Sequence, residues 1–175
     1  MRRHLPIALI AALIPGVALV ALLASPAQAD VFGAACVTDG DTLVVNGKRR
    51  HTRCVGGTRV RLFGIDAPEL KQKCRHASGR DFLCGRAAAS FLLEHVRGRP
   101  VECKGNSVDR YGRLIATCFI DGKNLNAMMV SAGWALAFRA HSEKYVPQEN
   151  IARKAKKGIW AMRFVPPWEW RRIKR

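Results

Sequence analysis

The stretch that decides the fold is Thr58-Arg-Val-Arg-Leu-Phe-Gly-Ile-Asp-Ala-Pro-Glu69. Val60 and Leu62 alternate with arginines, which is the period-two pattern of a strand with one apolar face and one arginine-bearing face. Pro68 ends the pattern, because proline lacks the N–H group that a sheet needs. We therefore predict a strand over residues 58–65, with acidic side chains gathered just beyond its end.

Further strands and helices are expected on both sides of this strand. The predicted strands are residues 32–37, 42–45, 101–104 and 114–120, and the predicted helices are residues 86–96, 125–131 and 147–157. Three strands, a helix, two strands and then further helices are typical of a small mixed barrel. The fold class is therefore α+β, an OB-type five-stranded β-barrel with about three helices packed outside.

One hairpin turn is predicted from a local signal. Asn46-Gly47 follows the strand at residues 42–45, and both residues tolerate a positive φ. The basic stretch 48–57 that comes next is expected to be a strand with a loop.

The N-terminal segment predicts a signal peptide, residues 1–29. Arg2 and Arg3 precede an apolar run over residues 5–23, and Ala27-Gln28-Ala29 supplies small residues at a cleavage site before Asp30. A transmembrane anchor is the alternative, but a proline and a glycine interrupt the run. We expect an exported protein, periplasmic or secreted, with no stable membrane association after signal cleavage.

Charge indicates a polyanionic partner. Removing Arg2 and Arg3 with the leader lowers the formal charge from +17 to +15. Such an excess attracts nucleic acid, anionic lipid or acidic polysaccharide, and charge alone does not choose among them. Residues 30–165 are expected to form one domain. Residues 166–175 form a basic tail with two tryptophans, which either packs, frays or binds single strands.

Six cysteines lie in the part that follows the leader. An even count behind a signal peptide favours disulfides. Zinc is disfavoured, because the sequence has no Cys-x-x-Cys pair and its histidines are scattered. Their number alone leaves the pairing open.

Five charged residues form a candidate chemical site. Asp41 and Asp66 are hard oxygen donors suited to calcium or magnesium. Glu69, placed beside such an ion, could take a proton from water, and Arg61 and Arg113 could each grip two phosphate oxygens. Singly, each has a structural explanation as a turn or a solvated strand residue, so only their joint occurrence carries the hypothesis.

Three motifs together resemble the thermonuclease (micrococcal nuclease) family. They are Asp39-Gly-Asp-Thr42, Arg61-x4-Asp66-x-Pro-Glu69 and Asp109-x-Tyr-Gly-Arg113, and the resemblance runs from about residue 37 to residue 160. The resemblance implies an OB-type barrel and a calcium-dependent endonuclease. It further implies hydrolysis of DNA and RNA, preferably single-stranded, with little sequence preference and 3′-phosphate products.

The resemblance also implies residue roles. Asp41, Asp66 and the backbone carbonyl of Ala67 correspond to calcium ligands, and Glu69 corresponds to the general base. Arg61 and Arg113 correspond to the arginines that bind the phosphate, and Tyr111 to a tyrosine near the substrate. We expect a monomer. The alternatives are a non-catalytic secreted OB-fold protein that binds nucleic acid, and a basic protein that binds lipid or polysaccharide.

The sequence departs from the best-known secreted type in three places. Phe138-Arg-Ala-His141 stands where that type has substrate-facing tyrosines. Phe138 could substitute for them in base stacking, but we expect it in the core. Residues 71–85 are remodelled, which could change substrate access. The implied barrel suggests three disulfides, which the best-known type lacks: Cys103–Cys118 between neighbouring strands, Cys74–Cys84 in the remodelled loop and Cys36–Cys54 by remainder.

Overall fold

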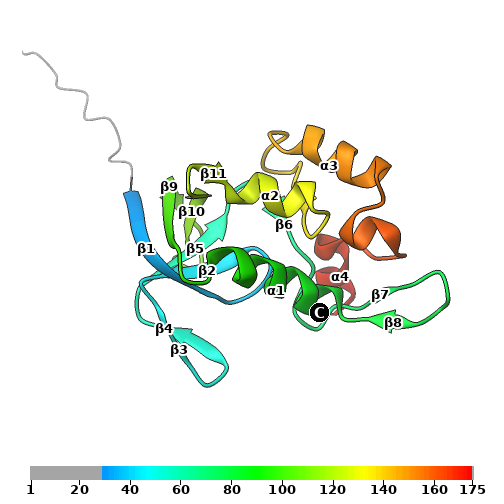
Figure 1. Cartoon of the computed structure of the whole chain (residues 1–175), viewed down its shortest axis with the longest axis horizontal. Helices are drawn as coiled ribbons and strands as arrows, with labels where there is room; N and C mark the ends of the chain where they lie inside the picture. The colour runs from blue at the N-terminus through cyan, green and yellow to red at the C-terminus, as the bar shows by residue number, and fades with distance from the viewer. Residues whose placement is uncertain (1–28, 175) are drawn as a thin grey trace, which may run out of the picture.

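The barrel has five strands that close on themselves. The computed structural model describes residues 29–174, so the predicted signal peptide lies outside the described residues except for Ala29. The strands are β1 (Ala29–Val37), β2 (Thr42–Val45), β5 (Thr58–Leu62), β9 (Pro100–Val108) and β10 (Leu114–Ile120). Their order is β10-β5-β2-β1-β9, and β9 pairs back onto β10 (Figure 1). Only β5 and β10 run parallel within this ring, and the α+β, OB-type prediction is confirmed.

Strand β5 follows the predicted alternation. Val60 and Leu62 are buried in the barrel core, whereas Arg59 is exposed. The strand ends at Leu62 rather than at residue 65, because Gly64 has a φ of 71° that a side chain would disfavour. The chain then forms β6 (Ile65–Asp66), which pairs with β12 (Leu136–Ala137) outside the barrel. Asp66 and Glu69 therefore follow the barrel strand rather than belong to it.

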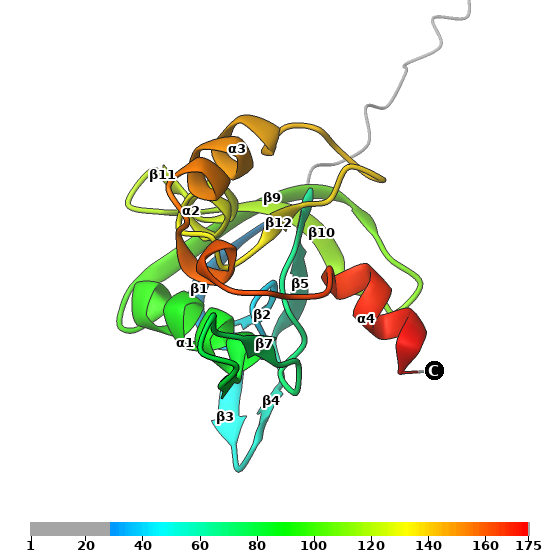
Figure 2. The same cartoon turned by 90° about the vertical axis from the view of Figure 1, so that its right-hand side faces the viewer.

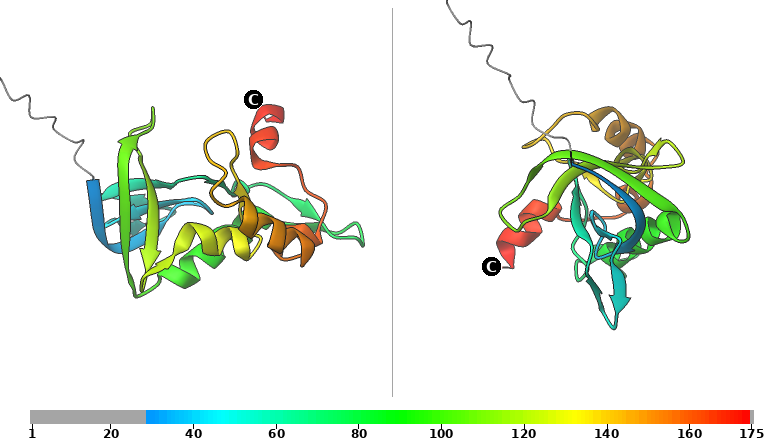
Figure 3. Two further views of the ribbon diagram at one scale, coloured as in Figure 1. Left: turned by 90° about the horizontal axis from the view of Figure 1, so that it is seen from above. Right: turned by 90° about the vertical axis from the view of Figure 1, so that its left-hand side faces the viewer.

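The helices lie outside the barrel. They are α1 (Cys84–Val96), α2 (Leu125–Ser131), α3 (Val146–Lys154) and α4 (Pro167–Ile173), with a short 3₁₀ helix η1 (Gly158–Ala161). On α1, Ala88, Leu92 and Val96 recur every fourth residue and are buried against the core. Helix α4 falls in the C-terminal tail and stands apart from α1, α2 and α3 (Figure 3).

The turn at Asn46 differs from the prediction. Asn46 has a φ of 59°, but β2 pairs with β1 and β5 rather than with the next strand. Asn46 donates from Nδ2 to the Phe32 carbonyl (3.0 Å) and from its backbone N–H to the Ala34 carbonyl (2.7 Å). These bonds hold the turn against β1, so the chain leaves the barrel. It forms a separate hairpin, β3 (Lys48–Arg50) and β4 (Arg53–Val55), which projects from the barrel (Figures 1 and 2).

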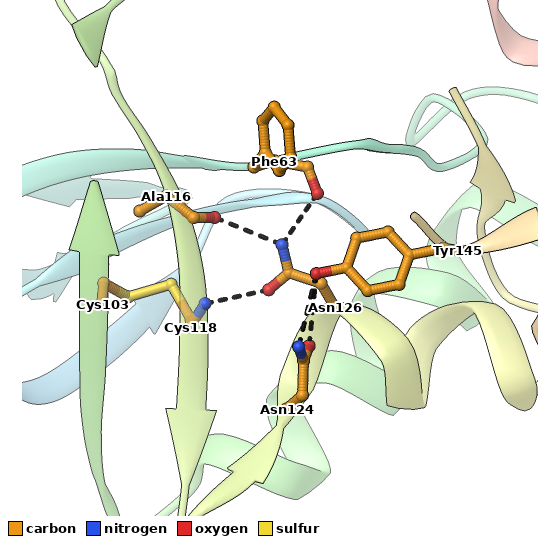
Figure 4. Close-up of a disulfide and its surroundings, with 7 residues drawn as sticks. All are labelled: Phe63, Cys103, Ala116, Cys118, Asn124, Asn126 and Tyr145. Atoms are coloured by element: carbon orange, nitrogen blue, oxygen red, sulfur yellow. Dashed lines mark hydrogen bonds between the residues drawn. A yellow bond between two sulfur atoms is a disulfide. The ribbon is translucent and has the colours of Figure 1, made fainter. Parts of the chain in front are cut away.

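A buried amide joins the barrel to α2 (Figure 4). Asn126 is fully buried, accepts from the Cys118 N–H (3.0 Å) and donates to the carbonyls of Phe63 (2.9 Å) and Ala116 (3.2 Å). Beside it, the Cys103–Cys118 disulfide joins directly paired residues of β9 and β10. This cluster fixes the point at which β5 leaves the barrel next to β10.

Three disulfides form, Cys36–Cys54, Cys74–Cys84 and Cys103–Cys118, the same pairs that the expected barrel suggested. The second closes a small hairpin, β7 (Cys74–Arg75) and β8 (Asp81–Phe82). A further short strand, β11 (Lys123–Asn124), pairs with β10. The three bridges suggest an oxidising, exported environment. Within residues 29–174, no helix has the length and apolar character needed to cross a membrane.

Candidate active site

The turn between β1 and β2 places two aspartates at one end of the barrel. Asp39 accepts the Asp41 N–H through Oδ1 (3.0 Å), and Asp41 accepts the Ala67 N–H through Oδ2 (2.7 Å). Gly40 permits this approach, because a Cβ at that position would lie 2.7 Å from the Ala67 Cβ and 2.8 Å from the Ala88 Cβ. The turn is therefore held directly against the end of β6.

One guanidinium joins the two predicted metal-ligand aspartates. Arg61 forms ion pairs with Asp41 Oδ1 and, at 2.8 Å, with Asp66 Oδ1. The Asp66 side chain is completely buried, and those of Asp41 and Arg61 are 9% and 15% exposed. Because both carboxylates bind one guanidinium, they must be neighbours. The structure therefore brings together Asp41 and Asp66, which lie 25 positions apart in the sequence.

Glu69 lies at the opening of the same site. Its backbone N–H donates to Gln72 Oε1 (3.2 Å), and Gln72, which is fully buried, donates from Nε2 to the Val165 carbonyl (2.7 Å). The Glu69 carboxylate is about one-third exposed, at 36%. The backbone around Glu69 is thus fixed while its carboxylate can meet solvent.

Arg113 and Tyr111 come from the loop between β9 and β10. Asp109 caps this loop by accepting the backbone N–H groups of Tyr111 (2.9 Å) and Arg113 (3.0 Å). Arg113 donates from Nε to Asp109 Oδ2 (2.7 Å) and from Nη1 to Thr42 Oγ1 (3.3 Å). Thr42 in turn donates to Asp41 (3.2 Å), so Arg113 reaches the edge of the acidic cluster. Tyr111 is exposed at the rim, with the Arg113 guanidinium 5.5 Å from its ring centre.

Electrostatics distinguish the buried groups. Burial, followed by repulsion from Asp41, raises the pKa of Asp39 to about 7. Burial likewise raises the pKa of Asp66, although the hydrogen bond from Arg171 opposes it. Burial alone would lower the pKa of Arg61, but Asp41 and Asp66 outweigh it, so the pKa is raised and the guanidinium stays charged. For both Asp39 and Asp66, burial is the largest cause of the raised pKa, and the neighbouring Asp41 carboxylate adds to it.

A pocket of about 580 Å³ opens over this cluster. Its lining includes five predicted or adjoining residues: Asp41, Arg61, Glu69, Tyr111 and Arg113. The other two predicted residues, Asp66 and Ala67, are buried at its edge, where Asp66 pairs with Arg61 and the Ala67 N–H binds Asp41. The role of the Ala67 carbonyl stays a prediction.

Two pocket residues escaped the sequence analysis. Asp39 is the first residue of the Asp39-Gly-Asp-Thr42 motif, but no role of its own was predicted for it. Arg171 on α4 binds Asp66 and Glu69, and more than a hundred residues separate it from either. No local pattern predicts such a pairing.

The expectation that Phe138 lies in the core is wrong. Phe138 is only partly buried, lines the pocket and stacks on Trp168 of α4, with ring centres 5.8 Å apart. Phe138 packs against Trp168 of α4, outside the barrel, rather than against the barrel core.

The donor set fits a hard divalent cation. Within the described residues, no three His, Cys, Asp or Glu side chains are arranged as a preformed metal site. Two neighbouring carboxylates would leave positions for a carbonyl, water and substrate oxygens, which suits calcium or magnesium at a catalytic site. Asp66 pairs with both Arg61 and Arg171, Asp41 pairs with Arg61, and Glu69 pairs with Arg171.

Known proteins share this sequence pattern. The model of the staphylococcal nuclease homologue family matches residues 59–162. An uncharacterized endonuclease of Escherichia coli O157:H7 is 36% identical over 151 residues, which cover 83% of this chain and 88% of the relative. A micrococcal nuclease of Shigella flexneri is 32% identical, over 89% of this chain and 88% of the relative. A succinoglycan biosynthesis protein of Rhizobium meliloti is 35% identical, and the match spans only 64% of its length. The chain belongs to the staphylococcal nuclease homologue family, and its nuclease relatives support a hydrolytic nuclease.

Proposed function

We propose that the protein is a calcium-dependent endonuclease that hydrolyses DNA and RNA, preferably single-stranded, with little sequence preference. The observation that carries this is the meeting of Asp41, Asp66 and Glu69 with Arg61 at one pocket, which Arg113 borders. A non-catalytic binding module has no use for two neighbouring buried carboxylates, which are the oxygen donors that a hard divalent cation prefers. All the residues that line the pocket come from one chain, and we propose that the protein acts as a monomer.

In this proposal Asp41 and Asp66, with the Ala67 carbonyl, would hold a calcium ion, which would supply Lewis-acid polarisation of the phosphate. In this structure Arg61 pairs with Asp41 and Asp66, and Arg113 pairs with Asp109. With substrate bound, each guanidinium would turn planar N–H groups to phosphate oxygens and neutralise the charge that develops as water adds to phosphorus. Tyr111, exposed at the rim, contacts the adjoining nucleotide.

Glu69 is placed to act as the general base. Because the Glu69 side chain is partly exposed at the pocket opening, its carboxylate can accept a proton from the attacking water as the new P–O bond forms. The bond from phosphorus to O5′ breaks, and that oxygen takes a proton from solvent. The products are a 3′-phosphate and a 5′-hydroxyl.

We also propose export by a signal peptide that ends at Ala29. A chain that begins at Asp30 retains all of β1 except its first residue, and Asp30 pairs with Lys104 of β9. Cleavage at this point therefore leaves the barrel closed. The compartment is then the periplasm or the medium, where the three disulfides persist.

Digestion of single-stranded DNA and of RNA tests the function. The wild-type protein is incubated with calcium and then with a chelator, beside Asp66→Asn and the control Asp121→Asn, whose carboxylate is 61% exposed and pairs with Arg99. We expect the wild type and the control to cut both polymers with calcium, leaving 3′-phosphate ends, and Asp66→Asn to lose cutting. Binding without cutting would establish the non-catalytic alternative, and cutting in the chelator would refute the calcium requirement.

A further inference from the structure

Helix α4 delivers an arginine to the acidic cluster. Arg171 donates from Nη1 to Asp66 Oδ1 (3.0 Å) and Glu69 Oε1 (2.9 Å), and from Nη2 to Asp66 Oδ2 (2.8 Å). One guanidinium thus bridges the proposed metal ligand and the proposed base. Arg171 lies outside residues 59–162, the part that matches the family model.

We infer that Arg171 competes with the divalent cation for the carboxylates of Asp66 and Glu69. Arg171 binds these carboxylates until the ion displaces it and the end of α4 withdraws. The inference rests on the proposed function, because it assigns the ion to the same carboxylates. Helix α4 would then control the access of the cation to the site, a role that the positive charge of the tail alone does not indicate.

The competition follows from the bonding of Asp66. Its oxygens accept three hydrogen bonds from two guanidiniums, one from Arg61 and two from Arg171. The Asp66 side chain is completely shielded, so an ion has no solvent-facing oxygen to bind while Arg171 is in place. A dication would also lie beside a second cation with little intervening solvent, and the two repel. Removal of Arg171 frees Asp66 Oδ2 and Glu69 Oε1 together.

The start of α4 is held by contacts with the rest of the protein, whereas its last residues are exposed. The Val165 carbonyl accepts from Gln72, Pro167 is buried, and Trp168 stacks on Phe138. Beyond Arg171 the chain is exposed, with Ile173 71% accessible. Figures 2 and 3 show α4 as the last element, apart from α1 to α3, so its final turn can leave without disturbing the barrel core.

Calcium titration calorimetry on the full mature chain tests the competition. We expect Arg171→Gln to bind calcium about tenfold more tightly than the wild type, within the usual range of coupling between two sites. Arg171→Lys, which keeps the charge but loses the two-pronged contact, should lie between them. The control is Arg172→Gln, which removes the same charge from the exposed neighbouring residue and should bind as the wild type does.

Hydrogen exchange of residues 165–174 reads the motion directly. Calcium should raise exchange in the last turn of the wild-type helix, and Arg171→Gln should show raised exchange before calcium is added. Unchanged or weaker calcium binding by Arg171→Gln, or calcium-independent exchange in the wild type, would overturn the competition. If the wild type and Asp66→Asn give the same calcium isotherm, the proposed metal site fails instead, and the two failures are thereby distinguished.

Discussion

Glu69→Gln isolates the proposed base, because the exchange keeps the side-chain shape and removes only its charge. Glu69 lies one-third exposed at the pocket opening, and its carboxylate pairs with Arg171 at 2.9 Å. General-base catalysis contributes a factor of about 10²–10⁴ to turnover. We therefore expect kcat to fall by that factor, which is about 2.7–5.4 kcal/mol of activation free energy.

Loss of stability cannot imitate this effect. The Glu69–Arg171 ion pair is about one-third exposed on both sides, and such pairs contribute at most about 1 kcal/mol to folding. Substrate affinity should change little, because we assign phosphate binding to Arg61 and Arg113 in the proposed function.

Single-turnover cleavage of a fluorescent oligonucleotide, with saturating calcium and separate measurement of the substrate Kd, provides the assay. Glu102→Gln is the matched control, since Glu102 pairs with Lys104 on the exposed face of β9. A Glu69→Gln rate within threefold of the wild type would remove Glu69 as the base. A parallel loss of substrate binding would assign it to binding instead.

Three further changes test the fold and its electrostatics. Replacing Cys103 and Cys118 by alanine opens a bridge of sequence separation 15, so urea denaturation should show a loss of about 3 kcal/mol, and an unchanged midpoint would contradict the role of the bridge. Asn126→Ala leaves buried backbone groups without partners and should lower the free energy of unfolding by at least about 2 kcal/mol in the same assay; a loss below about 0.5 kcal/mol would show that the amide does not hold α2. Because the pKa of Asp39 rises from 3.8 to about 7 on folding, its contribution to stability is present below about pH 4 and is lost as the pH rises through 7. In chelator, Asp39→Asn should therefore gain stability relative to the wild type between pH 4 and pH 8, and a constant difference across this range would refute the shift.

The alternation in β5 could be predicted because burial imposes a period of two on a half-buried strand. Val60 and Leu62 face the core as that period requires. The Asn46 turn was located correctly, but its partner strand was not. A turn dipeptide determines where the backbone reverses, whereas pairing depends on distant strands, here β1 and β5.

The candidate site was predictable where its residues sit in compact motifs. Asp41, Arg61, Asp66 and Glu69 come from two such motifs, and the barrel brings them together. Arg171 could not be predicted, because its contacts span 102 and 105 residues and depend on where α4 packs. The outer position of Phe138 depends on the same helix through Trp168.

The convergence of the site on one ion and one phosphate can be measured directly. A crystal structure of Glu69→Gln, soaked with calcium and a short single-stranded oligonucleotide, retains the ligands while preventing cleavage. We predict a single calcium ion bound by Asp41 and Asp66, with Arg61 and Arg113 on the same phosphate. An ion bound elsewhere, or the two arginines on different phosphates, would contradict the proposed active site.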